Sequence, residues 1–173
     1  MELMEAVNKR RSVRNYRDRP VEEEKLKRVL EAGRLAPSAK NLQEWRFIIV
    51  RDKNKRLELM SAAKGQKFVS EAPIVIVACA VNTDYKMTCG QYAYPIDVAI
   101  ALTHISLKAV EEGLGTCFIG AFYEDKVKEI LSIPREVRVV ELMTLGYPKE
   151  INPTINRKEM EEIVCYEKWN FSI

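Results

Sequence analysis

The stretch that decides the fold is Pro73-Ile74-Val75-Ile76-Val77-Ala78-Cys79-Ala80-Val81, which is apolar at every position. A strand with one face in water alternates apolar and polar residues, whereas a strand covered on both faces is apolar throughout. We therefore expect residues 73–81 to form the strand at the centre of a sheet.

The segments around this strand alternate between extended and helical patterns. The alternation indicates a mixed architecture of helices and strands, and a length of 173 residues suits a single domain, residues 1–173. Further strands are expected at 45–50, 116–120 and 137–146, and helices at 2–10, from Pro20 to about Ala36, at 53–63, 93–111, 124–131 and 158–163.

The helix expected at 93–111 is apolar on nearly every side. Such a helix lies either in the middle of a core or against a second subunit, and we favour the second in so small a domain. The tail, residues 164–173, carries Tyr166, Trp169 and Phe171, whose aromatic rings need a surface that buries them. We expect the tail to pack on a partner subunit.

Charge is nearly balanced along the chain, with 28 basic residues, 25 acidic residues and a formal net charge of +3. The two signs are interleaved, which is not the pattern of a nucleic-acid-binding protein. The exception is Lys9-Arg10-Arg11-Ser12-Val13-Arg14, where four cations fall within six residues. This segment either binds an anion or is a solvated helix end with cations favoured by the helix dipole. It is too small a footprint for nucleic acid.

The cysteines and the apolar segments bear on cellular location. The four cysteines are widely spaced and form no CxxC pair, which argues against a metal cluster or a disulfide framework and favours a reducing, cytoplasmic compartment. The first residues lack the basic start and apolar run of a signal peptide. The longest apolar stretch, 93–110, is interrupted by Asp97, His104 and Lys108, so no membrane span is expected.

Common catalytic motifs are absent from the sequence. It has no GxxxxGK[ST], HExxH or GxSxG motif, and Gly113-x-Gly115 follows a helix, whereas a dinucleotide-binding loop follows a strand. The single histidine, His104, is interpreted as a hydrogen-bonded core or interface residue. Asp97 is interpreted as a residue near a helix N-terminus that is satisfied by nearby amides. We therefore expect no catalytic side chain and no metal site.

Five short pieces of sequence stand out in a fixed order. They are Arg10-Arg11-Ser12-Val13-Arg14, the segment APSAKNLQEWRF at 36–47, Gly113-Leu114-Gly115-Thr116-Cys117-Phe118-Ile119-Gly120, Leu145-Gly146-Tyr147-Pro148, and Arg157. Together they resemble the nitroreductase family of FMN enzymes, over nearly the whole chain to about residue 160. The sequence departs from the family pattern at Glu44, where a proline usually precedes the tryptophan, so the local turn is not carried over from the family.

The resemblance implies an α+β fold of three layers (α/β/α), with a central mixed, mainly antiparallel sheet flanked by helices. It also implies a homodimer with flavin sites at the subunit interface. Arginine and serine donors suit the phosphate of FMN, and a glycine lets the backbone approach the flavin ring. The residues implied for FMN are Arg10, Arg11, Ser12, Arg14 and Arg157 around the phosphate, Pro37, Ser38, Ala39 and Asn41 from the other subunit, Gln66 at the pyrimidine edge, and the amides of Ile119 and Gly120 facing N5 and O4.

By the same resemblance, the chain is expected to pass electrons from NADH or NADPH to a small acceptor, such as a nitroaromatic or a quinone, in a ping-pong cycle. A flavin carries this chemistry itself, so the protein binds, orients and tunes it. Two alternatives stay open. One is a flavin enzyme of the same fold with other chemistry, such as flavin fragmentation, dehalogenation or azoline oxidation. The other is a non-catalytic module that binds flavin or another anion.

Overall fold

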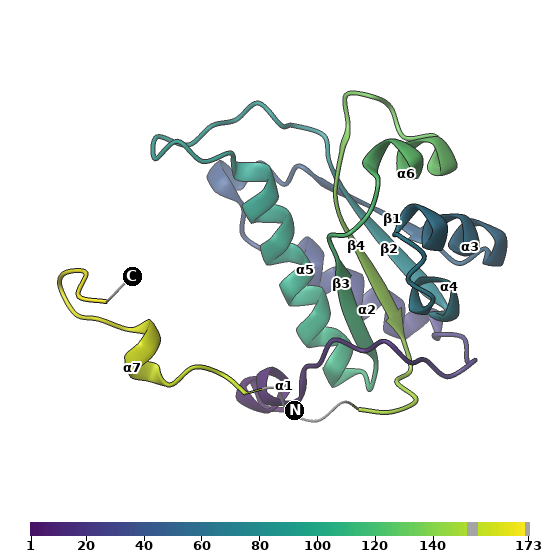
Figure 1. Cartoon of the computed structure of the whole chain (residues 1–173), viewed down its shortest axis with the longest axis horizontal. Coiled ribbons are helices and arrows are strands. Elements are labelled where there is room, and N and C mark those ends of the chain that lie inside the picture. Colours follow the sequence, from purple (N-terminus) through teal and green to yellow (C-terminus); the bar gives the residue numbers. More distant parts are fainter. Residues whose placement is uncertain (152–155, 172–173) are drawn as a thin grey trace.

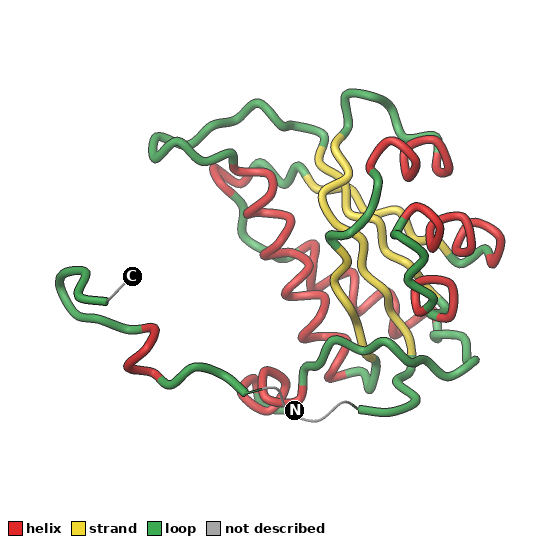
Figure 2. The backbone as a smooth tube through the Cα atoms, in the orientation of Figure 1, coloured by secondary structure: helices red, strands yellow, loops and turns green. Residues whose placement is uncertain are grey.

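The computed structural model describes residues 1–151 and 156–171 of the chain. Its centre is a four-stranded sheet in the order β1-β2-β4-β3 (Figures 1 and 2). The predicted central strand is confirmed, because β2 pairs with β1 on one side and β4 on the other, and all its residues are buried. The strands are β1 (Trp45–Val50), β2 (Ile74–Ala80), β3 (Gly115–Ile119) and β4 (Arg138–Gly146).

The strand pairs β1–β2, β2–β4 and β3–β4 are all antiparallel, which agrees with the expected sheet. The register places Ile76 of β2 opposite both Ile49 and Met143. Between Ala78 and Cys79 the register of β2 against β4 shifts, and such a bulge bends and twists a sheet locally. The loop that precedes β1 leaves the sheet at this same end, since Trp45 lies opposite Ala80.

Helices cover both faces of the sheet and form the expected three layers (Figure 1). Helices α2 (Glu23–Arg34) and α5 (Ala93–Glu111) cover one face, and α3 (Lys53–Ala62), α4 (Phe68–Glu71) and α6 (Glu124–Leu131) cover the other. Burial on both faces explains the unbroken apolar run of β2. Its alternate residues enter the two cores: Ile74, Ile76 and Ala78 on the side of α2 and α5, and Val75, Val77 and Cys79 on the other.

Short helical segments lie outside these layers. They are α1 (Leu3–Lys9), the 3-10 turn η1 (Ala39–Asn41) and α7 (Met160–Ile163). The helices and strands expected from the sequence are confirmed, with ends shifted by a few residues at most. The sequence did not predict α4 or η1, because segments of four and three residues are too short to show a helical period.

Helix α5 meets two different environments. Its inner face, with Val98, Leu102 and Ile105, is buried against the sheet and α2. Although α5 is long and apolar enough to cross a membrane, such packing is that of a core helix. Its outer face is apolar yet open, and forms a shallow groove lined by Pro95, Ile96, Ala99, Ile100, Thr103 and His104. The inner face is therefore core, and the outer face is free to meet a second subunit.

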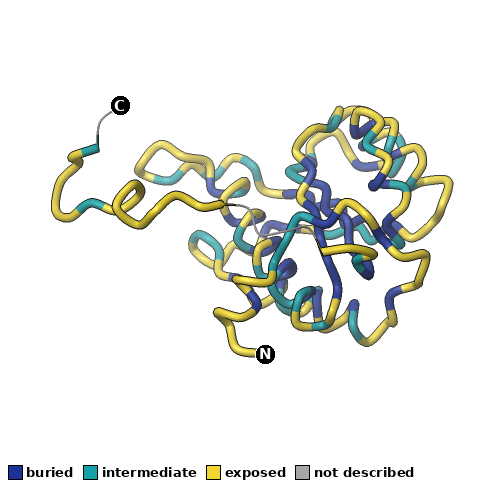
Figure 3. The backbone as a smooth tube through the Cα atoms, turned by 60° about the horizontal axis from the view of Figure 1, so that its bottom comes forward, coloured by how far each residue is buried: buried dark blue, intermediate teal, exposed yellow. Residues whose placement is uncertain are grey.

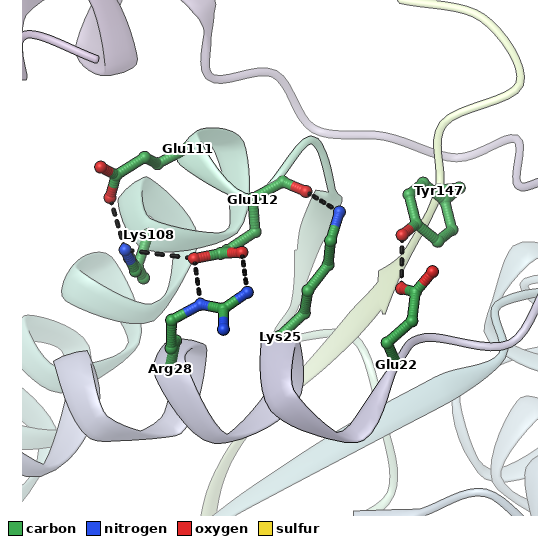
Figure 4. Close-up of polar contacts among 7 residues, drawn as sticks. All are labelled: Glu22, Lys25, Arg28, Lys108, Glu111, Glu112 and Tyr147. Atoms are coloured by element: carbon green, nitrogen blue, oxygen red, sulfur yellow. Dashed lines mark hydrogen bonds and ion pairs between the residues drawn. The ribbon is translucent and has the colours of Figure 1, made fainter.

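An ion-pair cluster fixes α2 to the C-terminal end of α5 (Figure 4). The Glu112 carboxylate accepts hydrogen bonds from Nε and Nη2 of Arg28, both at 2.8 Å, and pairs with Nζ of Lys108 at 3.2 Å. The Glu112 carbonyl accepts from Nζ of Lys25 at 2.6 Å. Arg28 above all, and then Lys108, lower the pKa of Glu112 to about 2. This cluster sets the position of α2, the helix that leads into the loop before β1.

The C-terminal part of the chain from residue 156 on, which includes residues 164–173 and is called the tail from here on, runs away from the body of the protein over its described residues, 156–171 (Figures 1 and 3). Tyr166 and Trp169 are 80% and 69% exposed. The Trp169 ring meets Phe171 edge-on, with centroids 5.0 Å apart. The chain itself thus leaves these two large aromatic residues uncovered, and their packing on a partner subunit stays a prediction.

Candidate functional site

The basic segment, residues 10–14, is held along the edge strand β3 by backbone contacts. The amide of Val13 donates to the carbonyl of Thr116 at 2.9 Å, and Ser12 forms an isolated parallel bridge with Thr116. The approach requires a glycine at position 115, since a Cβ there would lie 2.5 Å from Cγ2 of Val13. The backbone of the basic segment is therefore fixed relative to the sheet.

The side chains of this segment divide between the core and the surface. Val13 is buried, whereas Arg14 is exposed, with its guanidinium 5.9 Å from the centroid of the Phe68 ring. Arg10, Arg11 and Ser12 are half-buried. Nη1 of Arg11 donates to the carbonyls of Asn8 and Arg10 at 2.6 and 2.8 Å, so Arg11 also closes the end of α1.

The buried Cys117 thiol shows how closely the polar groups gather at β3. Burial raises its pKa, and Arg14, Ser12 and Arg10 each oppose that rise. Ser12 therefore lies within hydrogen-bonding reach of this thiol, and Arg14 and Arg10 are near enough for their charges to act on it. Two guanidinium groups and a hydroxyl are the donors expected at a phosphate, and their role in binding one stays a prediction.

The C-terminal end of β3 supplies the second part of the candidate site. Ile119 is buried and Gly120 is exposed. Nε2 of Gln66 donates to the carbonyl of Ala63 at 3.0 Å and lies 3.4 Å from that of Ala121, so Gln66 is tied to the chain just beyond Gly120. About four residues of strand, or ~13 Å, separate this end of β3 from Ser12 and its neighbours.

Glu141 is a residue of this region that the sequence analysis did not single out. It lies on β4, where burial raises the pKa of its carboxyl and the amide of Ile119 partly opposes the rise. A Cβ on Gly120 would lie 3.8 Å from Oε1 of Glu141. In this chain the Ile119 amide thus faces Glu141. An acidic residue within the apolar strand 138–146 was the signal that could have indicated it.

The loop before β1, residues 37–43, is built by side-chain contacts. The amide of Ala39 donates to Oδ2 of Asp97 at 3.1 Å, and the amide of Gln43 donates to Oγ of Ser38 at 3.0 Å. Asp97 is 3% exposed, so its interpretation as a residue satisfied by nearby amides is confirmed. Positive φ angles occur at Lys40, Asn41 and Gln43 (50°, 56° and 49°), which is uncommon for residues other than glycine. Pro37 and Asn41 are exposed, and Ser38 and Ala39 half-buried.

The basic segment and the loop lie at opposite ends of α5. Asp97, in the second turn of α5, holds the loop, whereas Arg11 and Val110 line one cavity of about 400 Å³ at the other end. A rise of 1.5 Å per residue separates Asp97 from Val110 by about 20 Å, as can be followed along α5 in Figure 1. Within one chain, residues 37–41 thus lie at one end of α5 and the basic segment lies at the other.

Arg157 follows the first described residue after the gap at 152–155. It is exposed at the start of the tail, where its Nη1 lies 3.4 Å from the carbonyl of Asn156. Its expected place beside the phosphate stays a prediction.

Comparisons with known proteins give the family of the chain. Residues 7–73 and 60–147 match the model of the nitroreductase family. The chain is 33% identical to a putative NADH dehydrogenase/NAD(P)H nitroreductase of Archaeoglobus fulgidus over 86% of this chain and 87% of that protein. It is 31% identical to FMN reductase [NAD(P)H] of Bacillus subtilis over 86% of this chain and 67% of that protein. The solved structure of an FMN-dependent nitroreductase from Clostridium difficile R20291 superposes with a TM-score of 0.84, at 32% identity, over 96% and 99% of the two chains. The chain therefore belongs to the nitroreductase family.

Proposed function

We propose that this protein is an FMN-dependent oxidoreductase that takes electrons from NADH or NADPH and passes them to a small acceptor, such as a nitroaromatic or a quinone. The observation that carries the proposal is the convergence of Arg10, Ser12 and Arg14 on β3, next to the exposed strand end at Gly120. Relatives named NAD(P)H nitroreductase and FMN reductase support the same chemistry.

The residues present fit FMN by the chemistry of their donors. Arg10, Arg14 and Ser12 bind the phosphate with charge-assisted and neutral hydrogen bonds. Gly120 has no side chain and is exposed, so its backbone can lie against the flavin ring and present its amide. Gln66, tied to the chain beyond Gly120, is the residue proposed to contact the pyrimidine edge. FMN, when bound, supplies the two-electron chemistry, and the side chains supply no acid, base or nucleophile.

The active unit proposed here is a homodimer. Since residues 37–41 and the basic segment lie at opposite ends of α5, the loop of one chain completes the site of the other. The open apolar face of α5 and the exposed Tyr166 and Trp169 are the surfaces that a second subunit would cover. All four cysteines are free, which suits the cytoplasm.

The two substrates are proposed to use one cleft in turn, in a ping-pong order. NADH or NADPH binds first, gives up its hydride and leaves, and the acceptor then enters the same space. Aromatic acids that resemble the acceptor should therefore compete with the nicotinamide. Non-competitive inhibition by such acids in steady-state kinetics would count against a shared cleft.

The visible spectrum of the purified protein tests the proposal. We expect the two-band absorbance of bound flavin, and bleaching of that absorbance when NADPH or NADH is added without oxygen. Bound flavin that neither nicotinamide reduces would instead favour a non-catalytic flavin-binding module. A protein that stays colourless after incubation with excess FMN would contradict the proposed function.

A further inference from the structure

Two acidic residues are buried together beneath the loop before β1. Glu44, at the end of that loop, is 2% exposed, and Asp97 of α5 is 3% exposed. The Glu44 carboxyl lies against Asp97, and Asp97 makes the ionised form of Glu44 less favourable. Glu44 is also the residue at which this sequence departs from the family pattern.

The two carboxyls have different surroundings. Its Oδ2 accepts the hydrogen bond of the Ala39 amide, and it lies near the N-terminal end of α5, where the helix dipole favours a negative charge. Neither carboxyl oxygen of Glu44 has a hydrogen-bond partner that meets normal geometry within residues 1–151 and 156–171. Two adjacent carboxylates removed from water cannot both stay ionised at small cost, so the proton belongs on Glu44.

The neighbouring elements offer the pair no counter-charge through the contacts that the structure describes. Lys40 turns its Nζ to the ring of Tyr85, 4.7 Å from the centroid. Arg46 donates from Nη1 to the carbonyls of Gln43 and Trp45. The end of β2 presents the amide of Val81 to the Glu44 carbonyl. Burial above all raises the pKa of Glu44, its own backbone amide opposes the rise, and Asp97 adds to it.

We propose that Glu44 is a positioning residue that stays neutral and donates its carboxyl proton to Asp97, and that the pair so formed fixes the FMN-binding loop through the Ala39 amide. The inference rests on the proposed function only for the role of the loop in FMN binding. The main claim of the inference, a proton shared by Glu44 and Asp97 beneath residues 37–43, can be tested on the protein without cofactor.

The proton makes the loop sensitive to rising pH. Because the pKa of Glu44 is higher in the folded than in the unfolded protein, the folded state holds the extra proton. The stabilisation that this proton gives to the folded state is complete below the unfolded pKa of Glu44 and is lost as the pH rises through its folded pKa. Above the folded pKa of Glu44, Asp97 faces a second negative charge, and the hydrogen bond from the Ala39 amide to Asp97 weakens.

The first test uses the cofactor-free protein and the variant Glu44→Gln, which keeps the shape and a hydrogen-bond donor. The infrared spectrum of the wild type at pH 7 should contain a protonated-carboxyl band that Glu44→Gln lacks and the exposed control Glu136→Gln keeps. The exchange protection of the Ala39 amide, corrected for intrinsic rates, should fall with rising pH in the wild type and not in Glu44→Gln. Absence of the band, or protection independent of pH in the wild type, would overturn the proposal. The pH series on the wild type decides it even if the variant does not fold.

The second test separates this inference from the proposed function. The dissociation constant of FMN in the wild type should rise by up to about tenfold per pH unit above the folded pKa of Glu44, and Glu44→Gln should remove that slope. Wild type that binds no FMN, with the infrared band present, would refute the proposed function and keep the carboxyl pair. Tight FMN binding with identical pH profiles in wild type and Glu44→Gln would refute the role of the pair in positioning the loop.

Discussion

The two parts of the candidate FMN site are held in different ways. The basic segment, residues 10–14, is attached to β3 through its backbone, by the bond from Val13 to Thr116 and the bridge at Ser12. The loop, residues 37–43, depends on particular side chains, mainly Asp97 and Ser38, and includes three positive φ angles. Backbone attachment tolerates many side chains, whereas the loop fails when one contact fails. We therefore expect substitutions in the basic segment to remove ligand contacts only, and substitutions under the loop to change its shape.

The largest effect is expected when the basic segment loses its charges. The double variant Arg10→Ala/Arg14→Ala should weaken FMN binding by about 100-fold or more, because each charge-assisted hydrogen bond contributes roughly 1.5–3 kcal/mol. Quenching of flavin fluorescence measures the affinity. Arg17→Ala is the matched control, since Arg17 lies three residues further on and donates to the Pro148 carbonyl. Equal affinities for the double variant and the control would place the phosphate elsewhere.

The next largest effect is expected when the tail loses its aromatic side chains, which we propose to hold together the dimer that joins the basic segment of one chain to the loop of the other. The variant Tyr166→Ala/Trp169→Ala should raise the dimer dissociation constant by about tenfold or more, as expected for aromatic anchors at an interface. Sedimentation velocity over a range of concentrations measures it. Glu161→Ala, also exposed on the tail, should leave the constant unchanged. A dimer of undiminished stability would show that the tail does not pack on the partner.

A smaller effect is expected in the loop. Asn41→Gly keeps the backbone freedom that a φ of 56° requires but removes the side-chain amide, so FMN affinity should fall about five- to tenfold for one lost hydrogen bond. Lys40→Gly is the matched control, since Lys40 has a φ of 50°. The same flavin titration applies to both. If both variants lose affinity equally, the loop acts through its shape rather than through Asn41.

The smallest effect concerns the cluster that sets α2, the helix before the loop. Glu112→Gln should lower the free energy of unfolding at pH 7 by about 1 kcal/mol, since it weakens a bidentate pair with Arg28. The folded pKa of Glu112, about 2, lies below the unfolded value. Its stabilisation is thus present above about pH 4.5 and lost as the pH falls towards 2. Urea unfolding at several pH values measures this, with Glu111→Gln as the exposed control. A difference that persists at pH 2 would contradict the assignment.

The fold could be predicted largely because its decisive signal is local. The apolar run 73–81 must be covered on both faces. The other predicted helices and strands are long enough for their pattern of apolar and polar residues to repeat. Helix α5 shows what the pattern of apolar residues cannot predict. Both of its faces are apolar in sequence, but one is buried in the core and the other forms an open groove. Short segments such as α4 and η1 have no period to detect.

The candidate site was less accessible to sequence reasoning. The motifs indicate residues 10–14 and 119–120, which lie along β3 and at its end, but they do not indicate Gln66 or the residues that surround them. The meeting of Glu44 with Asp97 joins residues far apart in the chain and depends on how the loop lies against α5. No periodicity encodes such a contact. Glu141, an acid in an apolar strand, was visible in the sequence as an exception to the pattern.

The central claim is that one FMN site takes its basic segment from one chain and its loop from the other. Two variants, Arg10→Ala/Arg14→Ala and Ser38→Ala/Asn41→Gly, each lose one part of every site. When they are mixed and allowed to exchange subunits, half of the dimers are mixed, and each mixed dimer regains one intact site. The measurement is the amount of tightly bound FMN, which should recover to about a quarter of the wild-type level. No recovery above the two variants alone, with exchange verified, would show that each site is built within a single chain.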